Sequence, residues 1–257
     1  MTLLLAIDVG NTNISLGLFR ARHLVSTERI STQGAKEIPR AVRRLLRKQR
    51  LHRMVIGGVI LSSVVPSATR PLKRSLQRLV GFEPLVVGET VQAPIRNRYR
   101  IPSQVGQDRL VNAVAAYTLY GGPVIVVDFG TAVTIDLVSG RREYRGGLIV
   151  PGIRIALEAL HTRAALLPKI SLRVPKQFLG LDTQGSMRSG IFFGYSALCD
   201  GIVKRLKVQY APRAKVVGTG GDAEQLARYC RTIRRINLDL TLQGLEITYR
   251  EGKRRFP

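Results

Sequence analysis

The chain has 257 residues, 45% of them hydrophobic and 23% charged, which is enough apolar material for a folded core and excludes a disordered chain. Lysine and arginine outnumber aspartate and glutamate by 41 to 17, a formal net charge of +24. The two cysteines are too few for a disulfide framework or a cysteine-built zinc site, so we expect a cytoplasmic location. No stretch approaches the roughly 20 apolar residues of a membrane span, and we expect no membrane partner.

The positive charge is spread evenly along the sequence. Residues 1–128 carry 19 basic and 7 acidic groups and residues 129–257 carry 22 and 10, so each half has a net charge of +12. Because no basic domain stands apart, the charge predicts a solvated surface rather than a nucleic-acid partner. Selected binding of a polyanion stays open as the alternative.

The N-terminal segment predicts a buried strand that turns back as a hairpin. Apolar residues 3–7 lead into Asp8-Val9-Gly10-Asn11-Thr12, and residues 14–19 then alternate in hydrophobicity. The pattern recurs at residues 124–127, followed by Asp128-Phe129-Gly130-Thr131-Ala132 and a second alternating run. The two aspartates are 120 residues apart, close to half the chain, which predicts two related domains rather than a solenoid.

Helices and strands are mixed between the two copies. Apolar residues at helical spacing predict helices over residues 35–50, 70–80 and 109–120, and buried strands are expected over 55–65 and 85–87. Prolines mark residues 93–105 as a loop. Gly121-Gly122-Pro123 then marks a boundary, so the predicted domains are residues 1–120 and 121–257.

The second half continues as mixed α/β structure. We expect a glycine-bracketed turn over 146–152, a helix to residue 160, and a long apolar helix over 189–209 that belongs either to the core or to an interface. A strand over 215–217 enters a glycine-rich loop at 218–221, with Asp222 available as the N-cap of the next helix. A last strand is expected over 245–249.

The two Asp-x-Gly turns predict an anion-binding site. Glycine allows a ligand to approach the backbone, and backbone amides with polar side chains can donate hydrogen bonds to an anion. A carboxylate beside a phosphate requires a bridging cation, and magnesium suits this role because it takes few protein ligands. Ordinary hairpin chemistry explains one such turn, but two matched copies and a third glycine loop favour a ligand site. The sequence contains no P-loop, so a nucleotide would be held by paired hairpin loops.

These motifs resemble those of the actin, sugar-kinase and heat-shock-ATPase superfamily and, more narrowly, of type III pantothenate kinases. The resemblance covers nearly the whole chain and runs through residues 8–12, 106–109, 128–132, 146–152, 219–221 and 242–245. It implies an α/β fold of two duplicated actin-like (ribonuclease H-like) domains with a cleft between them. It also implies ATP-dependent phosphorylation of pantothenate to 4′-phosphopantothenate, the first step of coenzyme A biosynthesis, by a homodimer.

The resemblance further implies the roles of individual residues. Asp108 would accept the proton of the substrate hydroxyl, and Asp128 would bind a monovalent cation, potassium or ammonium. Pantothenate would be contacted by Tyr99, Gly106, Gln107, Asp108, Arg109 and Thr183. ATP with its magnesium would be held by Asp8, Val9, Gly10, Asn11, Thr12, Asn13, Ile14, Ser15 and Thr131. The chain departs from the family at Asp182, where asparagine is more usual.

Elementary chemistry agrees with the role implied for Asp108. This residue stands in the first turn of a predicted helix, where the helix dipole favours the ionised carboxylate. Phosphoryl transfer depends more on positioning the hydroxyl than on a strong base. Arg109 would bind a substrate carboxylate or the transferred phosphoryl group, or instead pair with Asp108 itself. Two other functions stay open: a phosphotransferase for another acceptor on the same scaffold, and a non-catalytic basic regulator.

Overall fold

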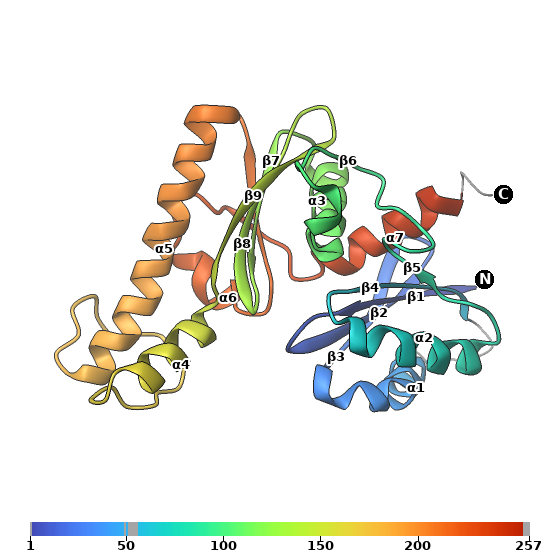
Figure 1. The fold of residues 1–257 in the computed structure, drawn as a ribbon, viewed down its shortest axis with the longest axis horizontal. Coiled ribbons are helices and arrows are strands. Elements are labelled where there is room, and N and C mark those ends of the chain that lie inside the picture. Colours follow the sequence, from blue (N-terminus) through green and yellow to red (C-terminus); the bar gives the residue numbers. More distant parts are fainter. Residues whose placement is uncertain (1, 49, 51–55, 254–257) are drawn as a thin grey trace. The chain divides into compact units, whose positions relative to one another are not determined.

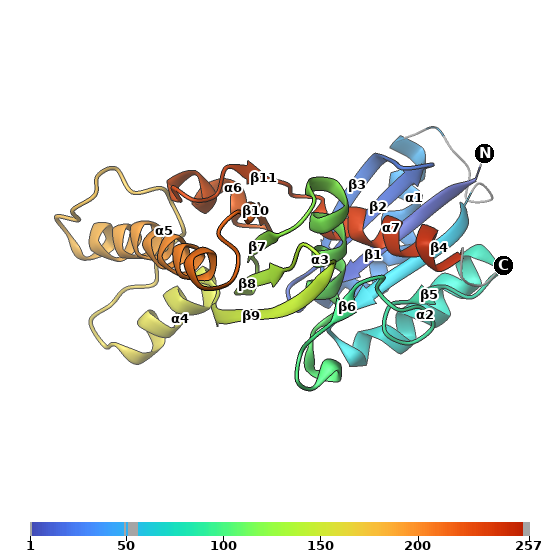
Figure 2. The same cartoon turned by 90° about the horizontal axis from the view of Figure 1, so that it is seen from above.

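The computed structural model describes residues 2–48, 50 and 56–253, which form two compact units. Unit 1 comprises Met1–Thr118 and Asp239–Pro257, and unit 2 comprises Leu119–Leu238. Each unit is a sheet flanked by helices (Figures 1 and 2). The division after Thr118 lies near the Gly121-Gly122-Pro123 segment, and the described residues 239–253 belong to unit 1 although they follow unit 2 in sequence.

The sheet of unit 1 has the strand order β3-β2-β1-β4-β5. β1 (Leu3–Val9), β2 (Asn13–Arg20) and β3 (His23–Ser31) form an antiparallel meander. β4 (Ile56–Ser63) lies parallel to β1, and β5 (Leu85–Val86) lies parallel to β4. The strand expected over 55–65 is therefore β4, except that residue 55 lies outside the described residues.

Helices cover both faces of this sheet. The short helical segment η1 (Thr32–Glu37) leads into α1 (Ile38–Lys48), which packs with α2 (Pro66–Val80) on the face formed by Leu3, Leu5 and Ile7. α7 (Leu240–Lys253) covers the opposite face of β1, β2 and β4, and α3 (Gln107–Tyr120) contacts α7. Figure 1 shows α1 and α2 below the sheet and α7 above it. β6 (Arg96–Asn97) and η3 (Pro102–Gln104) lie in the segment that was expected as a loop.

Unit 2 repeats the strand order of unit 1. β7 (Val124–Phe129), β8 (Ala132–Val138) and β9 (Glu143–Pro151) form the meander, β10 (Lys215–Thr219) lies parallel to β7, and β11 (Arg235–Ile236) lies parallel to β10. The order β9-β8-β7-β10-β11 matches β3-β2-β1-β4-β5 strand for strand. The predicted duplication is confirmed.

The helices of unit 2 enclose an apolar core. α4 (Ile153–Arg163), α5 (Thr183–Tyr210), α6 (Ala223–Leu226) and η4 (Ala227–Tyr229) surround it. Ile191, Phe192 and Cys199 of α5 are buried there, so the apolar character of this helix serves the core at these positions. Within the residues described, no helix, α5 included, is both long and apolar enough to cross a membrane.

A buried carboxylate fixes α5 to the segment that follows η4. Asp200, only 8% exposed, accepts hydrogen bonds from the Thr232 hydroxyl at 2.6 Å and from the amides of Arg231 and Thr232 at 2.8 Å each. Burial acts to raise the pKa of Asp200, but the Thr232 hydroxyl and these two amides hold that pKa below its ordinary value. The ionised carboxylate is therefore part of the folded structure.

Two predicted elements are wrong. Residues 245–249 were expected as a strand, yet they belong to helix α7. Leu240, Leu245 and Thr248 of that helix are all fully buried, and burial against the sheet overrides the local β-propensity. Residues 146–151 were expected in a turn but extend β9, because they complete the antiparallel ladder with β8.

Candidate active site

The first Asp-x-Gly turn is a tight connection between β1 and β2. The Gly10 amide donates to the Asn13 carbonyl at 3.0 Å, and a Cβ at position 10 would lie 3.1 Å from that same oxygen. Thr32 supports the turn from outside, because its hydroxyl donates to the Gly10 carbonyl at 2.6 Å and its amide donates to the Thr12 carbonyl at 3.0 Å. The side chains of Asn11, Thr12 and Asn13 are exposed. The turn therefore presents polar groups on a braced backbone.

Asp8 is the centre of a polar row across three strands. It lies opposite Ser15 of β2 and level with Ser62 of β4. Paired residues of neighbouring strands point to the same face of a sheet. For this row it is the face covered by α7: Gly58, four residues before Ser62 on β4, has its Cβ direction toward Tyr249 of α7. Ser62 is fully buried, and its Oγ has no hydrogen-bond partner among the described residues. Sequence reasoning missed this hydroxyl.

The Gly106–Arg109 segment meets the end of this sheet. The Val64 amide donates to the Val9 carbonyl at 3.1 Å, and a Cβ at Gly106 would lie 3.7 Å from Val64 Cγ1. Val64 therefore joins the segment before α3 to the strand that carries Asp8. Within unit 1, the structure thus brings together the two motifs that sequence reasoning singled out.

Asp108 has its side chain oriented by its own helix start. Its Oδ1 accepts a hydrogen bond from the Arg109 amide at 2.8 Å, and that amide also donates to the Gly106 carbonyl at 3.1 Å. The carboxylate is half-buried, whereas Arg109 is only 7% exposed. A Cβ at Gly106 would lie 2.5 Å from Asp108 Oδ1, so a side chain at position 106 would displace the carboxylate. The predicted position in the first helical turn is correct.

Gln107 and Tyr99 belong to the same unit. The Gln107 side chain packs over Gly88, where φ is +87° and an added Cβ would lie 2.7 Å from Gln107 Cδ. Its Oε1 is buried and has no partner in the part of the chain that the structure describes. Tyr99 is half-buried, and its amide donates to Asn97 Oδ1 at 3.0 Å. Asn97 Nδ2 in turn donates to the Pro102 carbonyl at 3.1 Å, which shapes the loop before α3.

In unit 2, the second Asp-x-Gly turn lies against the glycine loop that follows β10. Asp128, half-buried at the end of β7, has its Oδ1 where a Cβ of Gly220 would fall. The same Cβ would lie 2.6 Å from the Phe129 carbonyl oxygen, and Gly220 has a φ of +96°. The Asp222 amide donates to that carbonyl at 3.1 Å. Only glycine fits both the backbone conformation and the space at position 220.

The N-terminus of α4 lies against the same turn. The Gly152 amide donates to the Thr131 carbonyl at 3.1 Å, and a Cβ at Gly152 would overlap that carbonyl. The exposed Thr131 therefore lies beside the N-terminus of α4, an end with positive electrostatic character. The 128–131 turn thus contacts both the start of α4 and the Gly220 loop within unit 2.

Asp222 has a different role from the one expected. It occupies the N-cap position of α6, but its side chain makes no capping hydrogen bond. Its buried carboxylate instead pairs with Arg154 at 2.9 Å and so ties the glycine loop to α4. The partners are 68 residues apart, and no local signal in the sequence predicts their contact.

Thr183 lies at the first position of α5 and is exposed. The preceding Asp182 caps the helix, because its Oδ1 accepts a hydrogen bond from the Gly185 amide at 2.6 Å. Asparagine has the same capping ability, so the departure from the family at this position preserves the helix start. Thr183 lines a polar hollow of about 630 Å³ together with Asp182, Gln184 and Arg188.

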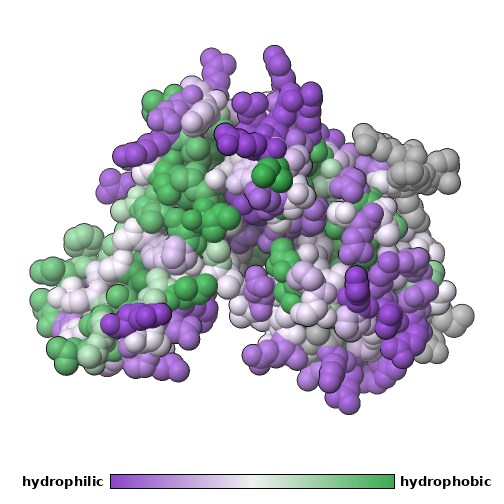
Figure 3. Space-filling view, in the orientation of Figure 1, coloured by the Kyte–Doolittle hydropathy of each residue, from purple (hydrophilic) through white to green (hydrophobic). Residues whose placement is uncertain are grey.

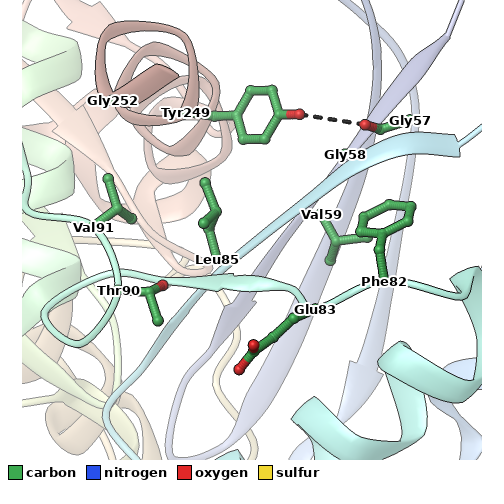
Figure 4. Close-up of a pocket in the computed structure, with 10 residues that line it drawn as sticks. All are labelled: Gly57, Gly58, Val59, Phe82, Glu83, Leu85, Thr90, Val91, Tyr249 and Gly252. Carbon is green, nitrogen blue, oxygen red and sulfur yellow. Dashed lines mark hydrogen bonds between the residues drawn. The ribbon is translucent and has the colours of Figure 1, made fainter. Parts of the chain in front are cut away.

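In unit 1, a hollow of about 360 Å³ lies at the end of the sheet opposite to Asp8 (Figure 4). It is lined by Gly57 and Gly58 at the start of β4, by Phe82 and by Tyr249 of α7, whose hydroxyl donates to the Gly57 carbonyl at 3.4 Å. None of the predicted site residues lines it. The candidate site is the other end of the strands, where Asp8, Ser62 and Val64 lie.

Comparisons with known proteins identify relatives along nearly the whole chain. The sequence model of a family described as "Type III pantothenate kinase" matches residues 4–205. Type III pantothenate kinases of Halalkalibacterium halodurans and Moorella thermoacetica are 42% and 44% identical over 253 and 250 residues, which is 97% and 96% of this chain and 100% and 98% of theirs.

The solved structures include the activator of 2-hydroxyisocaproyl-CoA dehydratase from Clostridium difficile with bound ADPNP. It has a TM-score of 0.62 and 13% identity to this chain, and the match covers 99% of this chain and 97% of that one. This likeness concerns the fold alone. The predicted α/β fold with a duplicated arrangement of strands is confirmed.

Proposed function

The chain belongs to the type III pantothenate kinase family and phosphorylates pantothenate in coenzyme A biosynthesis, and on this premise we propose how its residues divide the reaction. The observation that carries the proposal is the junction at Val64, which joins the Asp8 turn to the segment of Asp108 within unit 1. A phosphate-binding turn and a group that receives a proton must lie close together in a kinase.

In the proposed reaction, the pantothenate hydroxyl oxygen forms a bond to the γ-phosphorus of ATP. The bond from that phosphorus to the β–γ bridging oxygen breaks, ADP leaves, and the hydroxyl proton passes to Asp108. The hydrogen bond from the Arg109 amide holds this carboxylate in one orientation before substrate binds. Such positioning supports phosphoryl transfer, whose loose transition state needs alignment more than strong basicity.

We assign pantothenate to Tyr99, the 106–109 segment and Thr183. Arg109 is buried, so its guanidinium would bind the pantothenate carboxylate away from competing water. Gln107 Oε1, buried without a described partner, would accept a hydrogen bond from a substrate amide or hydroxyl group. Gly106 supplies the space in which the Asp108 carboxylate turns back.

We assign ATP to the two Asp-x-Gly turns. In the first, Val9 and Ile14 are buried and would act through their backbone, whereas Asn11, Thr12, Asn13 and Ser15 would offer side chains to phosphate oxygens. In the second, Thr131 would contribute from beside the N-terminus of α4.

The residues present fit the two cations that the family implies. Among the described residues, no group of three or more histidine, cysteine or acidic side chains could cage a metal, and magnesium bound to a nucleotide needs only one or two carboxylates. Asp8, with the partnerless Ser62 hydroxyl beside it, suits the water-rich shell of that ion. The Asp128 carboxylate, which lies with the Phe129 carbonyl against Gly220, suits potassium or ammonium. When bound, such cations would neutralise phosphate charge.

We also propose that the kinase is a cytoplasmic homodimer. Leu148 and Ile149 of β9 and Ile155 of α4 are 39%, 61% and 44% exposed, an apolar surface that a second copy could cover. Figure 3 shows a broad hydrophobic area over this side of unit 2. Both cysteines are free and buried, which suits a reducing compartment.

The experiment that tests this assignment is a coupled ADP-release assay with pantothenate, run with potassium, ammonium or sodium as the monovalent cation. The wild type should turn over with potassium or ammonium and much more slowly with sodium. Asp128→Asn should lower turnover with potassium to the sodium level. Equal cation dependence in the variant and the wild type would refute the site at Asp128, while leaving the pantothenate kinase activity itself intact.

A further inference from the structure

Among the four α-helices of unit 1, an excess of basic residues is found on one face of the sheet. α1 and α2 together contain nine basic and no acidic residues, whereas α3 and α7, which lie on the other face, contain three of each. The even distribution along the sequence therefore conceals an uneven distribution in space. A surplus caused by composition alone would be shared by all four helices.

Six arginines of α1 and α2 are exposed and make no ion pair within the described residues; we call these six the basic face: Arg40, Arg43, Arg47, Arg70, Arg74 and Arg78. Neighbouring basic residues do have acidic partners, since Arg44 and Lys48 pair with Glu28 and Lys73 pairs with Glu83. The two helices that carry the basic face pack against each other. Figure 3 shows mostly hydrophilic residues on this side of unit 1.

The basic face is not part of the proposed catalytic site. Ile38, Val42 and Leu45 of α1 and Leu72 and Leu76 of α2 are buried against the sheet, so the arginines point outward, away from it. The Ser15–Asp8–Ser62 row lies on the other face. Attraction of the small anionic substrates therefore does not explain charge at this place.

We propose that the basic face binds the sugar-phosphate backbone of double-stranded nucleic acid, independently of sequence. Arginine, whose planar guanidinium matches phosphate oxygens, is better suited to this than lysine, and the two helices have seven arginines to two lysines. α2 has 15 residues and extends about 22 Å at about 1.5 Å per residue, the length of roughly six phosphates of one strand.

A membrane surface fits the basic face less well. Helices that bind lipid place exposed Leu, Phe or Trp side chains into the bilayer interface. Among the described residues of α1 and α2, no large hydrophobic side chain is exposed. The face also offers no apolar anchor for a protein partner, whereas binding to phosphates requires only fixed, accessible charges.

The test is fluorescence anisotropy of labelled 30-base-pair DNA and RNA duplexes with the full-length protein between 50 and 200 mM salt. One variant changes the six arginines of the basic face to glutamine. The matched control changes six exposed arginines of unit 2 to glutamine, with the same loss of charge: Arg141, Arg163, Arg173, Arg205, Arg213 and Arg234. Both variants should keep the kinase activity of the wild type, which shows that they fold.

We expect the basic-face variant to bind at least tenfold more weakly at 50 mM salt, with a salt slope lower by about 0.9 for each phosphate that the variant no longer neutralises. The control should stay within about threefold of the wild type, because long-range charge is screened over roughly 10 Å at such salt concentrations. Equal weakening of both variants would overturn the proposal in favour of total charge. Absence of duplex binding at 50 mM salt, or tighter binding to phosphatidylserine vesicles than to either duplex, would also overturn it.

Discussion

The carboxylate of Asp128 occupies the space that a side chain at Gly220 would need. The two residues are far apart in sequence but adjacent in the sheet of unit 2, where the end of β7 meets the end of β10. Gly220 also has a φ of +96°, so its backbone and its surroundings both exclude a Cβ. The position of the carboxylate thus depends on the absence of a side chain on the neighbouring loop.

Gly220→Ala should therefore displace Asp128 and strain the loop. We expect a loss of about 1–3 kcal/mol in the free energy of unfolding, measured by denaturant titration, together with weaker activation by potassium. Gly190→Ala is the control, because Gly190 lies in α5 with open space around its Cβ direction, and alanine is the better helix former. If Gly220→Ala were as stable and as strongly activated by potassium as Gly190→Ala, the close packing of Asp128 against Gly220 would have no role in either property.

Asp108→Asn should lower kcat by at least about a hundredfold, because asparagine cannot accept the hydroxyl proton. The fold should be unchanged, since the amide oxygen can still accept the hydrogen bond from the Arg109 amide. Steady-state ADP release and thermal unfolding measure the two quantities. Glu158→Gln, at an exposed position of α4, should match the wild type in both. Turnover of Asp108→Asn within tenfold of the wild type would exclude Asp108 as the proton acceptor.

Ser62→Ala separates a structural role of this residue from a ligand-binding one. A buried hydroxyl without a partner does not stabilise a fold, so its removal should leave the free energy of unfolding unchanged or raise it. If the hydroxyl completes the shell around ATP and its magnesium, the KM for ATP should rise roughly fivefold, corresponding to a hydrogen bond of about 1 kcal/mol. Ser67→Ala, at an exposed position of α2, is the control. An unchanged KM would assign Ser62 no part in nucleotide binding.

Asp200→Asn should destabilise unit 2 in a pH-dependent manner. Asparagine replaces one acceptor oxygen by a donor that faces a backbone amide, so we expect a loss of about 2–3 kcal/mol at pH 7. Because the folded pKa of Asp200 is lowered, its contribution is present above the ordinary value of 3.8 and is lost as the pH falls through the folded value. Denaturant titrations should show a constant difference from the wild type between pH 7 and 5 and a smaller one below about pH 4. A difference that stays constant to pH 3 would argue against an ionised Asp200.

Local signals in the sequence predicted the strands and turns that carry the site. The alternation of residues 3–7 and 14–19 around an Asp-x-Gly turn is a property of neighbouring residues, and β1 and β2 form there. The repeat at Asp128 similarly predicted the second hairpin, and the apolar pattern of residues 109–120 predicted helix α3. These elements needed no knowledge of tertiary contacts.

Features that depend on contacts between residues distant in sequence could not be predicted from local patterns. The partnerless hydroxyl of Ser62 acquires meaning only because β4 lies beside β1. Asp222 pairs with Arg154 rather than capping α6, since folding brings the two within 2.9 Å. Residues 245–249 alternate like a strand, yet burial against the sheet of unit 1 selects the helix.

The return of α7 to unit 1 has a consequence for biosynthesis. A ribosome releases the first 118 residues long before it has made the helix that covers one face of their sheet. At about 5–20 residues per second, this delay is on the order of ten seconds. Unit 2 is formed by one continuous segment, whereas the sheet of unit 1 stays uncovered on one face until the segment from Asp239 onward has been made. Unit 1 is therefore completed last, although most of it is translated first.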